Sequence, residues 1–167
     1  DHNGVITESS GWPANWPPAK LWNRSFGYGC SSPIIVEGKL YVMGWRGDKR
    51  RGGADTLYCI QVATGKELWK QSYPCRYQGR VSTGDERAYG GPSSTPTFDK
   101  STGFIYTISI DGDLMCRDTA KGGKLLWKLN FYDKYKVPRR PHVGGGRRDY
   151  GYPGSVLIRG KTLLVEV

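Results

Sequence analysis

The chain has 167 residues and a formal net charge of +10 at pH 7, from 25 Lys and Arg against 15 Asp and Glu. Hydrophobic residues make up 37% of it, enough for a packed core, but no apolar run approaches the ~20 residues that a membrane-spanning helix needs. The 24 glycines and 11 tyrosines suit many tight turns and short strands. No segment keeps an apolar period of 3.6 residues, so we expect no long helix.

The first set of predicted elements begins after a loop rich in Gly, Tyr and Ser at residues 27–33. An apolar run at 34–36 is followed by the turn 37–39 and a second apolar run at 40–43. A third alternating segment leads to a Thr-Gly-Lys turn at 64–66, and a fourth carries Trp69. Four short strands joined by turns predict one antiparallel four-stranded sheet.

The same order repeats further along the chain. A second loop at 89–96 precedes apolar runs at 97–98 and 104–108, and a Gly-Gly-Lys turn precedes a strand that carries Trp127. A third loop at 151–155 precedes runs at 156–158 and 162–165. Within the second set, Asp111-Gly112 lies between alternating strands and is typical of a tight hairpin turn. Asp111 and Asp113, on either side of this glycine, are a weaker candidate for a pair of calcium ligands.

A short phrase that runs from Lys to Trp occurs at residues 20–22, 66–69 and 124–127. A phrase that recurs at about 50 residues indicates a repeat architecture. Because the repeated unit contains only strands and turns, it predicts the blades of a β-propeller.

These residues resemble the pyrroloquinoline-quinone-like (PQQ-like) propeller repeat, in which blades end in a pattern like Ala-x-Asp-x-x-Thr-Gly-Lys-x-x-Trp. Residues 59–69 match this pattern with Cys59 at the Ala position and Gln61 at the Asp position, and residues 116–127 keep the acid as Asp118 but carry one extra residue. The resemblance implies that the Trp of one blade docks on a turn of its neighbour. The residues implied in this structural role are Trp22, Trp69, Trp127, Gly65 and Gly122.

We therefore predict an all-β fold, a partial β-propeller of four-stranded antiparallel blades. Residues 1–26 would form an N-terminal arm and the last strand of a closing blade, 27–75 and 76–132 two whole blades, and 133–167 a basic connector with two strands of a further blade. Closed propellers have about four to eight blades, so we expect an N-terminal fragment completed by the remaining blades of its own chain. The alternative is that several copies assemble one ring.

The opening of the chain is also similar to large propeller proteins of bacterial exported proteomes. It places His2-Asn3-Gly4 before a stretch rich in Trp and Pro at 12–18. This likeness implies a periplasmic or secreted protein.

Four cysteines are present, and none has the Cys-x-x-Cys spacing of a zinc site. Cys59 and Cys116 occupy the same repeat position, where a small residue would face the blade interior, so we expect them to pack as small hydrophobic residues. Cys30 and Cys75 lie in successive connections between blades. A disulfide between them is a possible alternative in an oxidising compartment.

Positive charge concentrates at 46–51 and 139–148. The first cluster joins the second and third strands of a blade and the second joins two blades, and in a propeller both kinds of loop emerge on one face. The chain thus predicts a basic rim that attracts phosphate, sulfate or carboxylate groups. Its candidate ligand-binding residues are Tyr28, Arg46, Arg50, Arg51, Tyr89, Arg147, Arg148 and Tyr152. The plain alternative is a set of solvated loop charges. Nucleic acid is disfavoured because the clusters lack a recognised nucleic-acid module.

Signals for catalysis are sparse. The two histidines, His2 and His142, lie at the terminus and in a basic loop, and neither a Gly-x-Ser-x-Gly elbow nor a phosphate loop occurs. Quinone-dependent alcohol dehydrogenases of the resembled family carry two adjacent cysteines beside the cofactor and acidic and Asn ligands for calcium. The chain has no adjacent cysteines. We therefore assign no catalytic or metal-binding residue and no cofactor; PQQ and calcium would be possible only in a full-length protein.

Three functions are compatible with the sequence. The first is a non-catalytic propeller that binds a protein or an anionic polysaccharide across the rim. The second is part of a quinoprotein alcohol dehydrogenase whose active site lies mostly beyond residue 167. The third is a scaffold propeller akin to the outer-membrane assembly lipoproteins built from this repeat. Fold alone does not choose among them.

Overall fold

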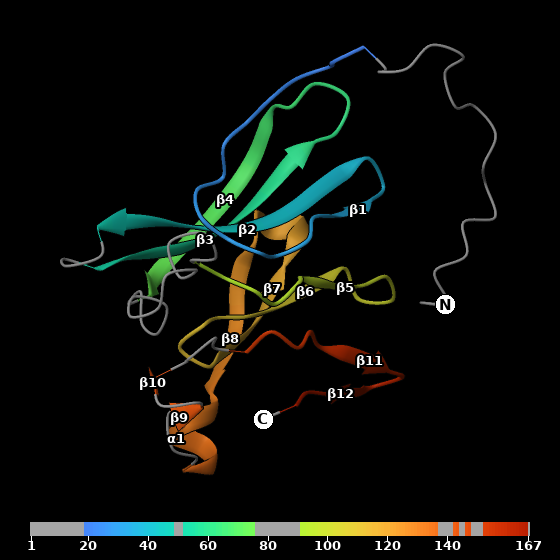
Figure 1. Ribbon diagram of the computed structural model, residues 1–167. Coiled ribbons are helices and arrows are strands. Elements are labelled where there is room, and N and C mark those ends of the chain that lie inside the picture. The colour runs from blue at the N-terminus through green and yellow to red at the C-terminus, as the bar shows by residue number, and fades with distance from the viewer. Residues whose placement is uncertain are drawn as a thin grey trace.

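The computed structural model (Figure 1) describes residues 19–48, 52–75, 91–136 and 152–166, and the backbone of 142–143 and 146–147. Two four-stranded antiparallel sheets follow one another along the chain, each with its strands in sequence order. The prediction of an all-β fold built from four-stranded antiparallel blades is confirmed. Among the described residues, no helix is long and apolar enough to cross a membrane.

The first sheet is an up-and-down meander. Its strands are β1 (Ile34–Val36), β2 (Lys39–Asp48), β3 (Gly52–Gln61) and β4 (Glu67–Cys75). The turn between β1 and β2 contains Gly38 at φ 71°. The turn between β3 and β4 contains Gly65 at φ 69°, a left-handed conformation that glycine adopts at least cost. These turns are the ones that the sequence predicted.

The second sheet repeats the meander with shorter strands. They are β5 (Thr97–Asp99), β6 (Phe104–Ile108), β7 (Asp113–Asp118) and β8 (Lys124–Asn130). Gly112, at φ 78°, lies in the tight connection between β6 and β7, as expected for an Asp-Gly hairpin turn. A short 3-10 helix, η1 (Thr119–Lys121), occupies the next turn, and one helical turn, α1 (Phe131–Tyr135), follows β8.

The remaining strands form two small antiparallel pairs. They are β9 (His142–Val143) with β10 (Gly146–Arg147), and β11 (Leu157–Arg159) with β12 (Thr162–Leu164). The second pair corresponds to the two strands predicted for a further blade. Residues 19–27 belong to no strand, and none of the described strands pairs with them. The assignment of this segment to the last strand of a closing blade stays a prediction.

Both large sheets place the same residue types in one row across their last three strands. In the first sheet, Tyr41 pairs with Cys59, and Cys59 pairs with Trp69. In the second sheet, Tyr106 pairs with Cys116, which pairs with Trp127. Both cysteines are fully buried, as expected for small hydrophobic residues that face the interior of a blade.

The core lies between successive sheets rather than inside one of them. Alternate residues of β2 point to opposite faces, so Tyr41 and Met43 join a cluster that includes Ile105 and Met115 of the second sheet. The residue between them, Val42, packs instead in a cluster with the N-terminal segment. A third cluster joins the second sheet to α1 and to the β11–β12 pair. Each sheet therefore buries both faces.

Tryptophan contacts link neighbouring elements. The Nε1 of Trp22 donates a hydrogen bond to the carbonyl oxygen of Val62 at 2.6 Å, and a Cβ added to Gly65 would lie 2.7 Å from the Trp22 ring. A Cβ added to Gly123 would lie 2.6 Å from the ring of Trp69. Gly122, the position inferred from the family pattern, has open space around it, so the extra residue in this turn moves the close approach to Gly123.

Candidate functional site

Two of the predicted rim residues, Tyr28 and Arg46, line a surface hollow of about 460 Å³ at the end of β2. The hollow is completed by Ser25, Gly27, Trp45 and Gly47. The Tyr28 side chain is 54% exposed, and its ring centroid lies 6.3 Å from that of the buried Trp45. One guanidinium nitrogen of Arg46 donates a hydrogen bond to the carbonyl oxygen of Ser25 at 2.6 Å. An aromatic face and a positioned cation thus share one concave surface.

Backbone pairing places these side chains. Tyr28 and Trp45 exchange two hydrogen bonds, from Tyr28 N to Trp45 O at 2.9 Å and from Trp45 N to Tyr28 O at 2.7 Å. The chain can approach β2 so closely because Gly27 lacks a side chain; an added Cβ would lie 2.3 Å from the Trp45 carbonyl oxygen. Gly53 on β3 leaves room for the Trp45 ring in the same way.

The other rim residues are described only in part. Arg50, Arg51, Tyr89 and Arg148 lie outside the described residues, and Arg147 is described only through its backbone in β10. Tyr152 departs from the expectation of an exposed ring: it is 4% exposed and packs edge-on against Phe131, with ring centroids 5.1 Å apart. The helical turn α1, which the sequence pattern did not indicate, supplies the residues that cover it.

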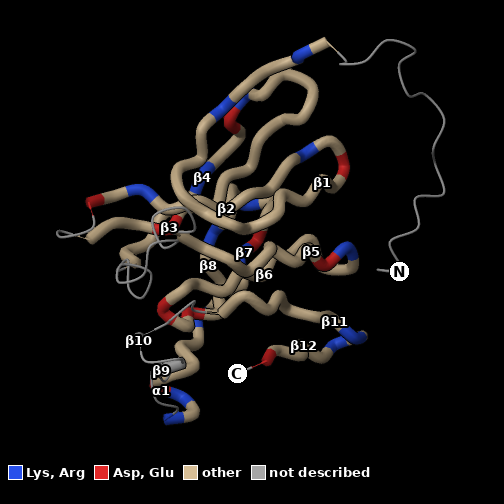
Figure 2. The backbone as a smooth tube through the Cα atoms, viewed as in Figure 1, with Lys and Arg blue, Asp and Glu red and all other residues tan. Residues whose placement is uncertain are grey.

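The described Lys and Arg residues favour neither end of the strands. Figure 2 shows Lys and Arg near the β2–β3 hairpin, but also at the β1–β2 and β11–β12 turns on the opposite side of the view. Lys39, the first residue of β2 after the β1–β2 turn, and Lys161, in the β11–β12 turn, are exposed. The described cations therefore do not by themselves separate a binding rim from ordinary solvated turns, and a test of the rim needs charge-matched controls.

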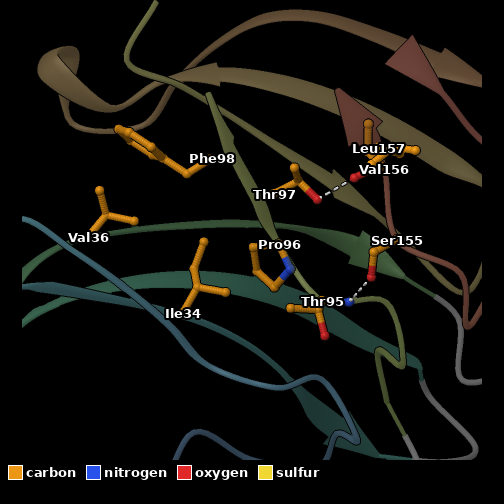
Figure 3. A pocket seen from close by; sticks show the side chains of 9 residues that line it. All are labelled: Ile34, Val36, Thr95, Pro96, Thr97, Phe98, Ser155, Val156 and Leu157. Atoms are coloured by element: carbon orange, nitrogen blue, oxygen red, sulfur yellow. Dashed lines mark hydrogen bonds between the residues drawn. The ribbon is translucent and has the colours of Figure 1, made fainter. Parts of the chain in front are cut away.

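A second concave surface runs along the first strands of successive sheets (Figure 3). It is a mostly apolar groove of about 520 Å³ lined by Ile34, Val36, Thr95, Pro96, Thr97, Phe98, Ser155, Val156 and Leu157. The Thr97 hydroxyl donates to the Val156 carbonyl oxygen at 2.7 Å, and the Thr95 N–H donates to the Ser155 hydroxyl at 3.0 Å. These hydroxyl groups connect neighbouring sheets, so they hold the groove together.

None of the four cysteines forms a disulfide, so the alternative of a Cys30–Cys75 disulfide does not occur in this structure. Cys75 is the last residue of β4 and is buried, whereas Cys30 is exposed. Burial is the largest cause that raises the pKa of the Cys75 thiol above its ordinary value, and the neighbouring carboxyl groups of Asp55 and Asp111 raise it further. A thiol held protonated in this way is a poor nucleophile.

Asp55 is the feature of this region that sequence analysis missed. It lies in β3 between Ala54 and Thr56 and is fully buried. Burial raises the pKa of its carboxyl group to about 7. The sequence does contain a signal for it: Asp55 lies on the same face of its strand as the apolar residues Leu57 and Cys59.

The family that the repeat pattern resembles implies PQQ and calcium, and the described residues do not fit these groups. The chain has no adjacent cysteines, and the described residues bring together no group of three His, Cys, Asp or Glu side chains that could hold a metal ion.

Comparison with known proteins finds a likeness to solved structures. No family model matches the chain, and no curated protein matches it. Among solved structures, the chain is similar to BamB from Moraxella catarrhalis, with 14% sequence identity and a TM-score of 0.48, over 83% of this chain and 34% of that chain. The chain thus spans about a third of the length of that structure. A likeness at this identity carries no residue role over to this chain.

Proposed function

We propose that this chain is a non-catalytic binding or scaffold module that captures an anionic group of a polysaccharide or a protein at the end of β2. The hollow shared by Tyr28 and Arg46 is the observation that carries this proposal. A guanidinium group presents five N–H donors in a planar fork, and the bond to Ser25 fixes its orientation. Sulfate and carboxylate groups accept two parallel hydrogen bonds from such a fork.

The remaining rim residues would extend this site. Arg50 and Arg51 come two and three residues after the end of β2, the strand that carries Arg46. The exposed Tyr28 ring offers a flat face on which a sugar ring or another guanidinium can stack. The net charge of +10 would raise the rate at which polyanions reach this surface.

Retention on immobilised sulfated or carboxylated polymer tests the proposal. We expect the double substitution Arg50→Ala and Arg51→Ala to weaken retention, and retention of the wild-type chain to fall steeply with salt because exposed charges are screened within about 8–10 Å. The matched control is Lys39→Ala with Lys161→Ala, which removes the same charge from the opposite turns. Equally weakened retention in both double variants would contradict the proposal and would indicate that the arginines serve only solubility.

The quinoprotein hypothesis has its own measurement. We propose that this segment alone binds no PQQ, because it lacks the adjacent cysteines. Titration of the purified chain with PQQ and calcium, followed by equilibrium dialysis, should show no stoichiometric binding, and tight binding would contradict the proposal.

A periplasmic or secreted location is likewise a proposal, which rests on the resemblance alone. Fractionation of cells that express the native gene would test it.

A further inference from the structure

A carboxyl group is enclosed where the two large sheets meet. Asp55 on β3 is 0% exposed, and it pairs across the sheet with Trp45 of β2 and Tyr73 of β4. Its Oδ2 accepts a hydrogen bond from the Tyr73 hydroxyl at 3.3 Å, and its Oδ1 has no hydrogen-bond partner. An ionised carboxylate in this position would keep an unsatisfied oxygen away from water, which is costly.

The groups around Asp55 come from both sheets. On β4, beyond Tyr73, the thiol of Cys75 donates to Oδ2 of Asp111 at 3.7 Å, and Asp111 belongs to the β6–β7 turn of the second sheet. Asp113 at the start of β7 also raises the pKa of Asp55 through its charge. The described surroundings of Asp55 are thus acidic on the side of the second sheet.

The cations in this region are committed to other groups. The guanidinium carbon of Arg117 lies 5.8 Å from the centre of the Tyr73 ring, and its Nη1 donates to the Gly123 carbonyl oxygen. Lys128 forms an ion pair with Asp113 at 2.9 Å. The ion pairs among the described residues do not include Asp55. The physical setting therefore favours a neutral carboxyl group.

We propose that the interface between the two sheets is linked to proton binding through Asp55: the neutral carboxyl group holds β3 and β4 against the β6–β7 turn, and its ionisation loosens that packing. This inference is independent of anion binding at the hollow. The packing that would loosen includes Trp45, whose Nε1 donates to the Cys75 carbonyl oxygen at 3.0 Å. Opening would give the ionised carboxylate access to water.

The direction of the pH dependence follows from linkage. Burial is the largest cause, and it raises the pKa of Asp55 in the folded chain to about 7 although hydrogen bonds with Cys75 and Tyr73 lower it; the ordinary value is 3.8. Between these values the folded chain holds a proton that the unfolded chain has released, so the stabilisation is lost as pH rises. The unfolding equilibrium constant should increase by up to about tenfold per pH unit across this window and should level off above about pH 7.

Urea unfolding of the full chain between about pH 5 and pH 9 tests the proposal. We expect the increase in the unfolding constant to be much smaller in Asp55→Asn, which keeps the shape of the side chain but does not titrate. The control is Glu37→Gln, an exposed carboxyl group in the β1–β2 turn, which should keep the wild-type slope. The proposal is overturned if wild type and Asp55→Asn show the same dependence on pH.

Two further measurements decide the matter if Asp55→Asn does not fold. Asp111→Asn removes one of the negative charges that raise the pKa of Asp55, so the levelling should move to lower pH. In wild-type chain labelled at the aspartate carboxyl carbons, infrared spectra should contain a protonated-acid band at about pH 6 that disappears by about pH 8.5. Absence of that band, or no movement in Asp111→Asn, would overturn the proposal.

Discussion

The two large sheets share their topology and differ in one hairpin. β2 and β3 have 10 residues each, whereas their counterparts β6 and β7 have 5 and 6. Both sheets contain the row of Tyr, Cys and Trp that closes the core. Trp45, Arg46 and Asp55 all lie in the part of the first hairpin that extends beyond its counterpart. Positions present in both sheets thus build the fold, and the extension contains the candidate site and the buried acid.

The two sheets also differ in how their last strands are covered. Trp69 on β4 contacts the Gly123 turn and lies 5.8 Å from the Tyr41 ring, while Trp127 on β8 is 41% exposed. Gln71 on β4 also donates to the Gly122 carbonyl oxygen at 2.8 Å. Equivalent tryptophans therefore have different surroundings in this chain, and the comparison can be tested at each of them.

The largest expected effect is at Trp69. Truncation of a well-packed Trp removes a large apolar contact area and leaves a cavity, so Trp69→Ala should lower the free energy of unfolding by about 3–4 kcal/mol. Trp127→Ala should cost about 1–2 kcal/mol, because more of its ring is already in water. Urea unfolding of both variants measures the difference. Equal losses would show that the covering turn does not distinguish the two residues.

A pair of glycines isolates the contact itself. Gly122 and Gly123 both have positive φ, at 63° and 74°, but only Gly123 has the Trp69 ring against the position of a Cβ. Gly122→Ala should cost about 1 kcal/mol for the left-handed backbone alone. Gly123→Ala should cost about 2–3 kcal/mol, because the Trp69 ring must also move. Thermal unfolding that ranks the two variants equally would remove the steric part of the argument.

Much of the fold could be predicted because it depends on local and periodic signals. Apolar runs separated by Gly-containing turns predicted the strands at 34–36 and 104–108, and the structure has them there. The row of Tyr, Cys and Trp in each sheet could be predicted because Cys59 and Cys116 occupy equivalent positions in the repeat. The close approach at Gly123 could not be predicted from spacing, because the inserted residue changes which glycine faces the tryptophan.

The candidate site was predicted less well, since it depends on tertiary contacts. Tyr28 and Arg46 do line one hollow. Tyr152 lies in a loop rich in Gly and Tyr, as Tyr28 does, yet residues of α1 cover its ring. Asp55 became significant only through the neighbouring sheet, which removes it from water and places Asp111 nearby. Sequence patterns assign a residue to a strand or a loop, but burial depends on which element packs against it.

A smaller effect is expected where the extended hairpin meets the core. Trp45→Phe keeps an aromatic ring but removes the Nε1 donor and leaves the buried Cys75 carbonyl oxygen without that bond, so it should cost about 1–2 kcal/mol. The equivalent position in the second sheet is Ile110, which is 5% exposed, and Ile110→Val should cost about 1 kcal/mol or less. Denaturant unfolding compares them. No loss in Trp45→Phe would mean that the hydrogen bond adds nothing to the extension.

The smallest effect on stability, and the most specific effect on function, is expected at Arg46. The side chain is exposed and bonds only to Ser25 in the described structure, so Arg46→Ala should change the free energy of unfolding by less than about 0.5 kcal/mol. The Arg46→Ala variant should nevertheless bind a sulfated polymer more weakly than the wild-type chain does. Arg46→Lys separates charge from geometry, because lysine keeps the cation but lacks the planar fork. Weak binding in both variants would indicate bidentate recognition. Binding that recovers in Arg46→Lys would indicate attraction by charge alone. Unchanged binding in Arg46→Ala would contradict the assignment of the hollow as the site.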